Sequence, residues 1–457
     1  MVIIKIVRSQ VIYSISNDSK KAYSHILRQL EQIDFEPDFF FLFLTEGIWK
    51  NYRIFTELFK ERFPYAKMLG CTVGGYFVKN EIWTRGIAAL LGEFDGRVEV
   101  FWANEKSATK TAKMLGKQIG KGWDSILLMF PAFYFPGRFE FIKFFINNKR
   151  YYRIFKIKNT EEDKRGVLRK YSDLLDKSKR IYPIDTVLKI ISDKTGKNTP
   201  IIGLNLMPLE ASANTPLILA NYKNLKNGMA AMCFKGKINT IFDDVFPERG
   251  NSYEETFEIV KDYFLGVEEV SVVKGGLVIA EVNGMKPVKF LEAKMSAFKE
   301  MKQDEFLKKV EDGKLQMATP YGLAFISQKT YGSSLLGLLN FPLDIYPSVF
   351  SMDDFYDSAA FCGEVFRGGI RIFGKIFEKK KFNGFDFYVI DHNTIMSFGG
   401  EVHRISKVIN EKSKSCFGIF SSFPSAYLPN PDRRYFSEID DGICVNVTGT
   451  SAILEFT

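Results

Sequence analysis

The stretch that decides the fold runs from Phe39 to Tyr76, FFFLFLTEGIWKNYRIFTELFKERFPYAKMLGCTVGGY. It begins with an uninterrupted apolar run, Phe39 to Leu44, which is typical of a strand covered on both faces. Apolar residues then recur at helical spacing from Ile48 to Phe63, and Ala66 to Thr72 has the composition of a short strand. The stretch therefore predicts a strand, helix and strand unit.

The segments around this unit predict further strands and helices. Ala22 to Ile33 has apolar residues at helical spacing, and Lys106 to Gly120 predicts another helix. Two strands, Gly86 to Leu91 and Val98 to Trp102, are expected to form a hairpin, because the residues between them include two glycines and an aspartate. Crossover units together with hairpins predict mixed sheets rather than purely parallel ones.

The length and composition indicate a globular chain of more than one domain. The chain has 457 residues, of which 46% are apolar and 26% charged, and this balance excludes a natively disordered protein. We expect an α/β to α+β fold with mixed β-sheets flanked by helices, arranged as a layered αββα-type sandwich. The sequence predicts a boundary near the turn residues Pro247 to Gly250 or just after a helix from Tyr253 to Leu265. This gives two halves of related size, residues 1–265 and 266–457.

The excess of positive charge is concentrated in one segment of the first half. The whole chain has a net charge of +9, and residues 138–180, here named the basic segment, hold fourteen Lys or Arg against six Asp or Glu. Aromatic residues such as Tyr151 and Phe155 alternate with these cations. One interpretation is a surface that stacks on bases and contacts phosphates of a nucleic acid or another anionic partner. The other is a set of amphipathic helices with a buried aromatic face and solvated Lys and Arg.

The sequence also predicts the compartment. The N-terminus lacks the apolar region and cleavage site of a signal peptide. The apolar runs are far shorter than the roughly 20 residues that span a bilayer. The five cysteines are scattered without paired spacing, which suits a reducing compartment. We expect a cytoplasmic protein without membrane contact, and the scarcity of Gln beside plentiful Lys, Glu and Ile indicates a thermophilic source.

The sequence lacks the common motifs of catalytic and cofactor sites. It contains no phosphate-binding Gly-Lys-Ser loop, no dinucleotide Gly-x-Gly-x-x-Gly motif and no Gly-x-Ser-x-Gly elbow. The histidines and cysteines form no paired motif of a zinc site, so neither a metal nor a cofactor is predicted. Cys71 is a candidate nucleophile, although a catalytic thiol needs a base nearby. We expect a non-catalytic protein in which Cys71 is a small buried apolar residue.

A glycine-containing loop follows the strand that ends at Thr72. Glycines there let backbone N–H groups converge on a small anion, through close approach and positive φ. The alternative is a strand end that turns tightly onto a neighbouring element. Hydroxyl, amide and carboxylate groups at later strand ends could fix a polar ligand. The predicted ligand-binding residues are Gly70, Cys71, Thr72, Gly74, Gly75, Asn205, Ser421, Glu438, Asn446 and Thr448.

These pieces occur in an order that resembles the FIST sensory domain, which is made of a FIST N and a FIST C half. In the N half, Leu69 to Gly75 resembles the family's Gly-Cys-Ser/Thr-x-x-Gly segment, and Pro200 to Gly203 resembles its second glycine-ended strand. In the C half, Ser437 to Ile439 resembles a Gly-Glu-Ile triplet with serine in place of glycine, and Asn446 to Thr448 resembles an Asn-x-Thr motif.

The resemblance implies an intracellular sensory module in signal transduction. Its proposed ligands are amino acids or related small polar metabolites, and such modules are commonly joined to signalling domains. No signalling domain is expected within these 457 residues. The resemblance therefore predicts a stand-alone sensor whose output partner is another protein.

Overall fold

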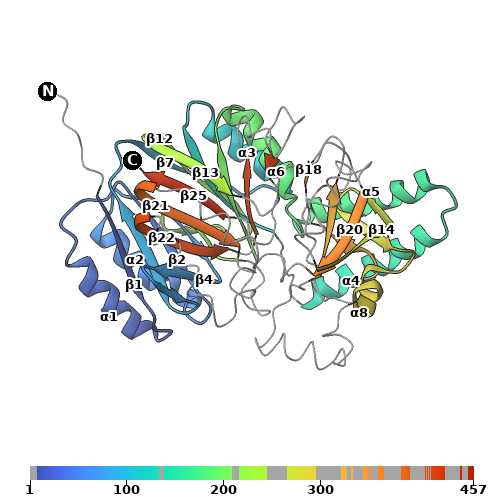
Figure 1. Ribbon diagram of the computed structural model, residues 1–457, viewed down its shortest axis with the longest axis horizontal. Helices are drawn as coiled ribbons and strands as arrows, with labels where there is room; N and C mark the ends of the chain where they lie inside the picture. Colours follow the sequence, from blue (N-terminus) through green and yellow to red (C-terminus); the bar gives the residue numbers. More distant parts are fainter. Residues whose placement is uncertain are drawn as a thin grey trace.

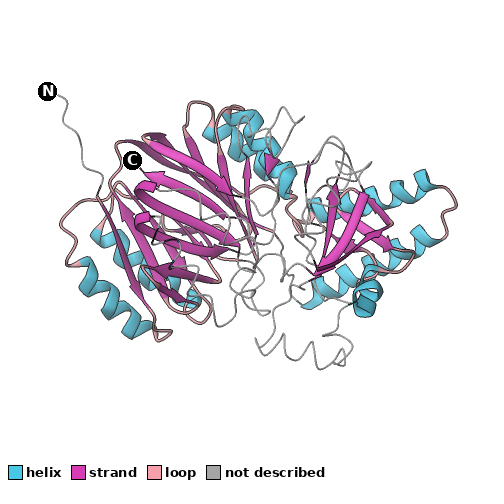
Figure 2. Cartoon of the chain, viewed as in Figure 1, coloured by secondary structure: helices cyan, strands magenta, loops and turns pink. Residues whose placement is uncertain are grey.

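The computed structural model describes residues 8–132, 138–207, 216–243 and 265–294, and shorter pieces at 321–326, 331–332, 343–348, 351, 359–364, 382–391, 407, 409, 411, 413–421, 423–427, 443–444 and 451–456. A large body of stacked sheets carries a smaller lobe at one end (Figure 1). Helices cover both outer sides of the body, and the lobe also combines strands with helices (Figure 2). No described helix has both the length and the apolar character that crossing a bilayer requires.

The first sheet is built around the stretch from Phe39 to Tyr76. Its strands, in spatial order, are β1 (Ser9–Ser14), β6 (Ile87–Gly92), β2 (Phe39–Leu44), β3 (Lys67–Thr72), β10 (Ile218–Ala220) and β11 (Lys223–Asn224). β2 and β3 are parallel and are connected through η1 (Trp49–Asn51) and α2 (Tyr52–Arg62), which confirms the predicted unit. α2 and α1 (Ser19–Leu30) pack against one face of this sheet.

The second and third sheets complete the body. The second sheet contains, in order, β24 (Ile443–Cys444), β23 (Phe423–Tyr427), β9 (Ile201–Leu206), β8 (Ser125–Pro131), β12 (Met229–Gly236) and β7 (Gly96–Ala103). Its outer face is covered by α3 (Ala108–Ile119) and α6 (Ile184–Thr195). The third contains β13 (Ile238–Asp243), β25 (Ser451–Phe456), β21 (Phe382–Asp391), β22 (Ser413–Ser421), β4 (Gly75–Val78) and β5 (Glu81–Trp83).

The three sheets share one apolar core in which phenylalanine is prominent. Phe39, Phe41 and Phe43 of β2 point into it, while the alternate residues of the strand face α1 and α2. The ring of Phe41 lies 4.9 Å from that of Phe387 in the third sheet, and the ring of Phe39 lies 5.3 Å from that of Phe234 in the second. Aromatic pairs at these distances stabilise the core beyond their buried area. This layering of helices and mixed sheets confirms the predicted sandwich.

The expected hairpin between Gly86 to Leu91 and Val98 to Trp102 is wrong. β6 lies in the first sheet, whereas β7 pairs with β12 in the second. The connection passes from one layer to the next, and Phe94 within it is buried in the shared core. The chain changes sheet again at Gly236, whose φ is 150°. Glycine and aspartate permit both a tight turn and a change of layer, so local composition does not separate the two.

The lobe contains part of the second predicted half together with the basic segment. Its described elements are α4 (Arg138–Lys156), α5 (Glu161–Lys177), β14 (Leu265–Val270), β15 (Val272–Gly275), β16 (Val278–Val282), α8 (Pro287–Lys294), β17 (Tyr321–Ile326), β18 (Tyr331–Gly332), β19 (Tyr346–Pro347) and β20 (Ala359–Glu364). β14, β20, β17 and β18 form one sheet, and β15, β16 and β19 form another. α5 packs on β15 and β16, so the basic segment lies against the strands of the second half.

Strands from both predicted halves contribute to the body. β21, β22 and β25 come from the second half and pair with β4 and β13 of the first. β23 likewise pairs with β9. The division into residues 1–265 and 266–457 stays a prediction, and the sheets themselves are continuous across it.

Candidate functional site

Three pairs of parallel strands in the body have polar residues at their carboxyl ends. The pairs are β2 with β3, β8 with β9, and β21 with β22. Thr72 is the last residue of β3, Asn205 is the last but one of β9, and Ser421 is the last of β22. All three residues are at most 4% exposed. Ligands of open α/β sheets bind beyond the carboxyl ends of parallel strands, so these strand ends are the candidate ligand-binding site.

The backbone brings these strand ends next to one another. The N–H of Gly74, two residues after Thr72, donates to the carbonyl of Phe420, the residue before Ser421, at 2.9 Å. Directly after Ser421 the chain passes from the third sheet to the second, where Phe423 pairs with Asn205. Segments more than 200 residues apart in the sequence therefore meet at one rim of the body, here named the strand-end site.

The strand-end side chains approach this rim from different faces. Cys71 faces the shared core, so its neighbour Thr72 lies on the face of the first sheet that α1 and α2 cover. Leu204 also faces the shared core, which places Asn205 on the side of α3 and α6. Ser421 lies on the core side of β22, in register with Ile419. Thr72, Asn205 and Ser421 therefore lie at the same strand ends but on different faces of their sheets.

Two of the buried hydroxyl groups at this rim stand out. Neither Thr72 Oγ1 nor Ser421 Oγ has a hydrogen-bond partner within the described part of the chain. The amide of Asn205 makes one contact at this rim, because its Nδ2 donates to Ser425 Oγ at 2.8 Å. A buried polar atom left without a hydrogen bond costs about 1–3 kcal/mol, so such atoms are rare and demand a reason.

The glycine loop does not form the anion cradle that its composition suggested. The N–H groups of residues 72, 73 and 74 donate to the carbonyls of Leu217, Leu44 and Phe420. Gly74 and Gly75 are not among the positive-φ glycines of the described residues. Gly70 is needed for close packing, because an added Cβ would lie 2.5 Å from the Leu42 carbonyl oxygen. The tight strand end, which was the alternative interpretation, fits these contacts.

Cys71 is fully buried, and its surroundings do not favour a nucleophile. Burial raises the pKa of its thiol far above the ordinary value, which keeps it protonated at neutral pH. His25 lies elsewhere, within 3.1 Å of Ser14 Oγ through its Nδ1. Among the described residues, no three His, Cys, Asp or Glu side chains are placed to hold a metal ion.

Three of the predicted ligand contacts, Glu438, Asn446 and Thr448, lie outside the described residues. Sequence reasoning missed Ser425, which is buried and bound to Asn205. No sequence pattern signals this contact, because the two residues are 220 positions apart.

A surface groove lies at the opposite end of the first sheet, near the start of β2 and β3. Its lining includes Arg62, Tyr65 and Lys67. Its cations already have partners: Arg62 lies 3.5 Å from Glu36, and Lys67 lies 3.0 Å from Glu99. The groove therefore presents paired charges rather than a polar site in need of a ligand.

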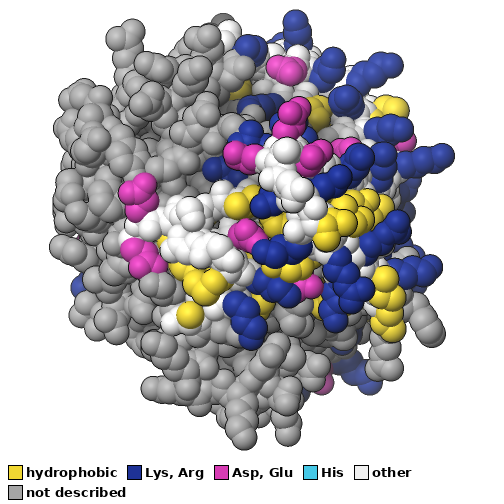
Figure 3. All heavy atoms as spheres, turned by 90° about the vertical axis from the view of Figure 1, so that its right-hand side faces the viewer, with side chains coloured by type: hydrophobic (Ala, Val, Ile, Leu, Met, Phe, Trp, Pro, Cys, Tyr) yellow, Lys and Arg dark blue, Asp and Glu magenta, His cyan; other side chains and the backbone are white. Residues whose placement is uncertain are grey.

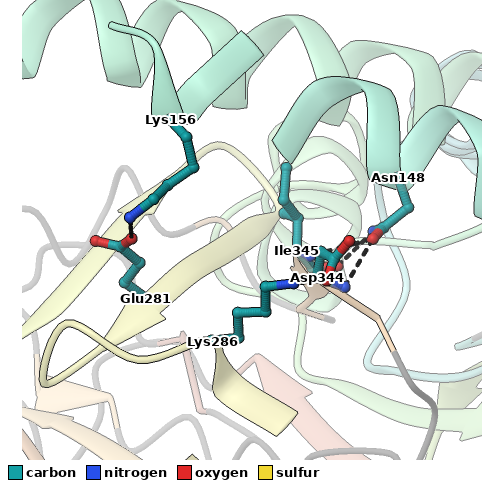
Figure 4. Close-up of polar contacts among 6 residues, drawn as sticks. All are labelled: Asn148, Lys156, Glu281, Lys286, Asp344 and Ile345. Atoms are coloured by element: carbon teal, nitrogen blue, oxygen red, sulfur yellow. Dashed lines mark hydrogen bonds and ion pairs between the residues drawn. The ribbon is translucent and has the colours of Figure 1, made fainter. Parts of the chain in front are cut away.

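The basic segment folds as two helices, α4 and α5, and its aromatic side chains from Phe144 to Tyr171 pack against the apolar core. Phe155 is fully buried, and the Tyr151 ring stacks on that of Tyr171 at 4.9 Å. The amide of Asn148 in α4 is buried against the two residues that precede β19: its Nδ2 donates to the Ile345 carbonyl, and its Oδ1 accepts from the N–H of Asp344 at 2.8 Å (Figure 4). These contacts support the interpretation of amphipathic helices.

Ion pairs add to this attachment. Lys156 Nζ donates to Glu281 Oε1 at 2.8 Å, and Lys286 pairs with Asp344 beside Asn148 (Figure 4). α5 is fixed to the body as well, because Asp176 accepts hydrogen bonds from the N–H and hydroxyl of Thr109 in α3. The basic segment is therefore an integral bridge between lobe and body, and not a loose arm.

Comparison with known proteins gives the family of the chain. Residues 254–367 match the family described as the AF0772-like protein C-terminal domain. A protein of Archaeoglobus fulgidus described as uncharacterized is 30% identical over 382 residues, which cover 84% of this chain and 99% of that protein. A second uncharacterized protein of the same organism is 40% identical over 43 residues, 9% of this chain and 69% of that protein. The chain therefore belongs to the family of AF0772-like proteins.

Proposed function

We propose that this protein is a FIST-like cytoplasmic sensor that binds a small polar metabolite, related to an amino acid, without catalysing a reaction on it. The observation that carries the proposal is the pair of buried hydroxyls, Thr72 Oγ1 and Ser421 Oγ, that have no hydrogen-bond partner within the described residues at the strand-end site. A ligand that exchanges hydrogen bonds with them would remove the penalty of burying them unpaired.

The chemistry of the site supports a hydrogen-bonding ligand over an anion. The described side chains at the rim are hydroxyls and an amide, and the loop N–H groups that would have held an anion are occupied. The predicted contact Glu438 would add a carboxylate suited to an ammonium group, as in an amino acid. Asn446 and Thr448 are the remaining proposed contacts.

The site also offers a route from binding to signalling. β22 and β23 are consecutive strands in different sheets, and Ser421 lies at the point where the chain passes between them. If the chain segment between β22 and β23 has two conformations, a ligand that binds one of them more tightly would shift the equilibrium toward it. The proposed output partner is another protein.

A thermal-shift screen of amino acids and organic acids tests the proposal. A ligand present at about 100 times its Kd stabilises the folded protein by about 2.7 kcal/mol, which gives a clear rise in melting temperature. We expect Thr72→Val and Ser421→Ala to abolish that rise. Thr111→Val, which alters a buried hydroxyl in α3 away from the site, should keep it. The proposal fails if no compound at millimolar concentration raises the melting temperature, or if the site variants respond like the wild type.

The nucleic-acid alternative has the support of charge alone. Lys143, Lys149, Arg150 and Arg153 are exposed on α4 and have no ion pair with a described residue. Of the aromatic side chains that would stack on bases, those from Phe144 to Phe155 pack against the apolar core. A steep salt dependence of DNA or RNA binding by the intact protein would favour this alternative.

A further inference from the structure

The outer face of α4 combines exposed isoleucines with cations. Ile142 is 55% exposed and Ile146 is 59% exposed, and Ile157, in the turn that ends the helix, is 75% exposed. Burying one such side chain stabilises a protein by about 1.5–3 kcal/mol relative to leaving it exposed. Several exposed isoleucines on one helix therefore forgo a large stabilising contribution. Grouped exposed apolar residues usually mark an interaction site.

These residues lie along one stripe of the helix. Ile142, Ile146, Arg150, Arg153 and Ile157 follow one another at intervals of four or three residues, the spacing of a single helical face. At 1.5 Å per residue the stripe is about 22 Å long, roughly four helical turns. The stripe faces away from the lobe, because Asn148 and Phe155 on the opposite face of α4 are buried in it.

The cations on this face are available to a partner. Lys143, Lys149, Arg150 and Arg153 are exposed, and none of them makes a hydrogen bond or ion pair with another described residue. Lys156 of the same helix is by contrast paired with Glu281. Lys and Arg side chains crowd this side of the molecule, with apolar side chains between them (Figure 3).

We propose that the outer face of α4 docks an acidic amphipathic helix of a second protein. The apolar residues of that helix would cover Ile142 and Ile146, and its carboxylates would meet Lys149, Arg150 and their neighbours. Nucleic acid fits less well, because isoleucines would face phosphates while the rings of Tyr151 and Phe155 pack against the apolar core. A membrane also fits less well, because Arg150 and Arg153 interrupt the apolar stripe between Ile146 and Ile157.

This surface is separate from the strand-end site and does not depend on its ligand. The probes are two synthetic helical peptides with the same leucine stripe, one flanked by glutamates and the other by lysines. Binding to the full chain is measured by fluorescence anisotropy at low and high salt. We expect the acidic peptide to bind, more tightly at low salt, and the basic peptide not to bind.

Two double variants locate the binding. Lys149→Glu with Arg150→Glu should weaken binding of the acidic peptide by about tenfold or more, since two attractive charge contacts become repulsive. The matched control, Lys113→Glu with Lys117→Glu on the exposed face of α3, changes the net charge equally and should leave affinity within about twofold. Ile146→Ser should also weaken binding, whereas Met114→Ser on α3 should not. Unchanged melting temperatures show that each variant is folded.

Three results would overturn the proposal. The acidic peptide does not bind the wild type, or the α4 and α3 double variants lose affinity equally, which would mean nonspecific attraction by net charge. In the third result, a single-stranded RNA or phosphatidylglycerol vesicles bind the wild type and lose binding in the α4 variants, while the acidic peptide has no affinity. That outcome would assign the surface to a different class of partner.

Discussion

The strand-end site and the interface of α4 with the lobe both bury polar side chains, but they treat them in opposite ways. Asn148 in the lobe uses its whole amide: Nδ2 donates to Tyr171 Oη and to the Ile345 carbonyl, and Oδ1 accepts from the N–H groups of Asp344 and Ile345. Thr72 and Ser421 at the strand ends use neither hydroxyl within the described residues. A satisfied buried group holds a structure together, whereas an unsatisfied one lowers stability and points to binding.

The largest expected effect is in the lobe. Asn148→Ala removes four hydrogen bonds and leaves buried backbone groups of Asp344 and Ile345 unpaired, so the free energy of unfolding should fall by about 3 kcal/mol. Denaturant unfolding followed by fluorescence measures this. Asn147→Ala is the control, because Asn147 makes no hydrogen bond with a described residue and should change stability by less than about 0.5 kcal/mol. Equal losses in the two variants would contradict the role given to Asn148.

The next prediction compares two buried threonines directly. Thr111 Oγ1 donates to the Ser107 carbonyl at 2.8 Å, so Thr111→Val should cost about 1–2 kcal/mol. Thr72→Val should leave the free energy of unfolding unchanged or raise it by up to about 1 kcal/mol, because an unpaired hydroxyl is replaced by a methyl group. Ser421→Ala should behave like Thr72→Val. A loss in Thr72→Val as large as that in Thr111→Val would remove the contrast between the two regions.

A smaller and pH-dependent effect is expected from Lys156. The hydrogen bond to Glu281 raises the pKa of Lys156 above its ordinary 10.5. Its stabilising contribution is therefore fully present below pH 10.5 and is lost as the pH rises through the higher folded-state value. Lys156→Met should lower stability at neutral pH by at most about 1 kcal/mol, because the lysine side chain is half exposed.

This difference from the wild type should shrink in alkaline solution, as measured by unfolding at a series of pH values. Lys149→Met is the matched control from the same helix, since Lys149 has no described partner and should change stability little at any pH. A difference for Lys156→Met that grows with pH would show that the pair with Glu281 does not act as described.

The last prediction concerns the chemical reactivity of the buried thiols of the body, where no change in stability is expected. Burial raises the pKa of Cys416 to about 12 and also raises those of Cys71 and Cys233. In a variant with Cys362→Ser and Cys444→Ser, a thiol reagent at neutral pH should react only after denaturant is added. Rapid labelling of folded protein, lost in Cys71→Ser, would instead restore Cys71 as a reactive group.

Local sequence predicted the strands and the candidate residues of the strand-end site, but it did not predict the hydrogen bonds that surround them. The apolar run Phe39 to Leu44 predicted a strand covered on both faces, and β2 lies between the shared core and the α1 and α2 layer. Thr72, Asn205 and Ser421 were predicted as candidate contacts because each follows or ends a strand. The anion cradle was not borne out, because the N–H groups of residues 72–74 are taken by three other strands or segments.

The sequence by itself determined the strands, the helices and the excess of cations in the basic segment, because these depend on residues a few positions apart. Only the tertiary structure decided that β6 and β7 belong to different sheets, that the basic segment bridges body and lobe, and that Gly74 bonds to Phe420. It also decided which polar groups are satisfied, since Asn148 finds one of its partners, Ile345, 197 residues away. Such pairings depend on the packing of whole layers, and no local pattern of residues encodes them.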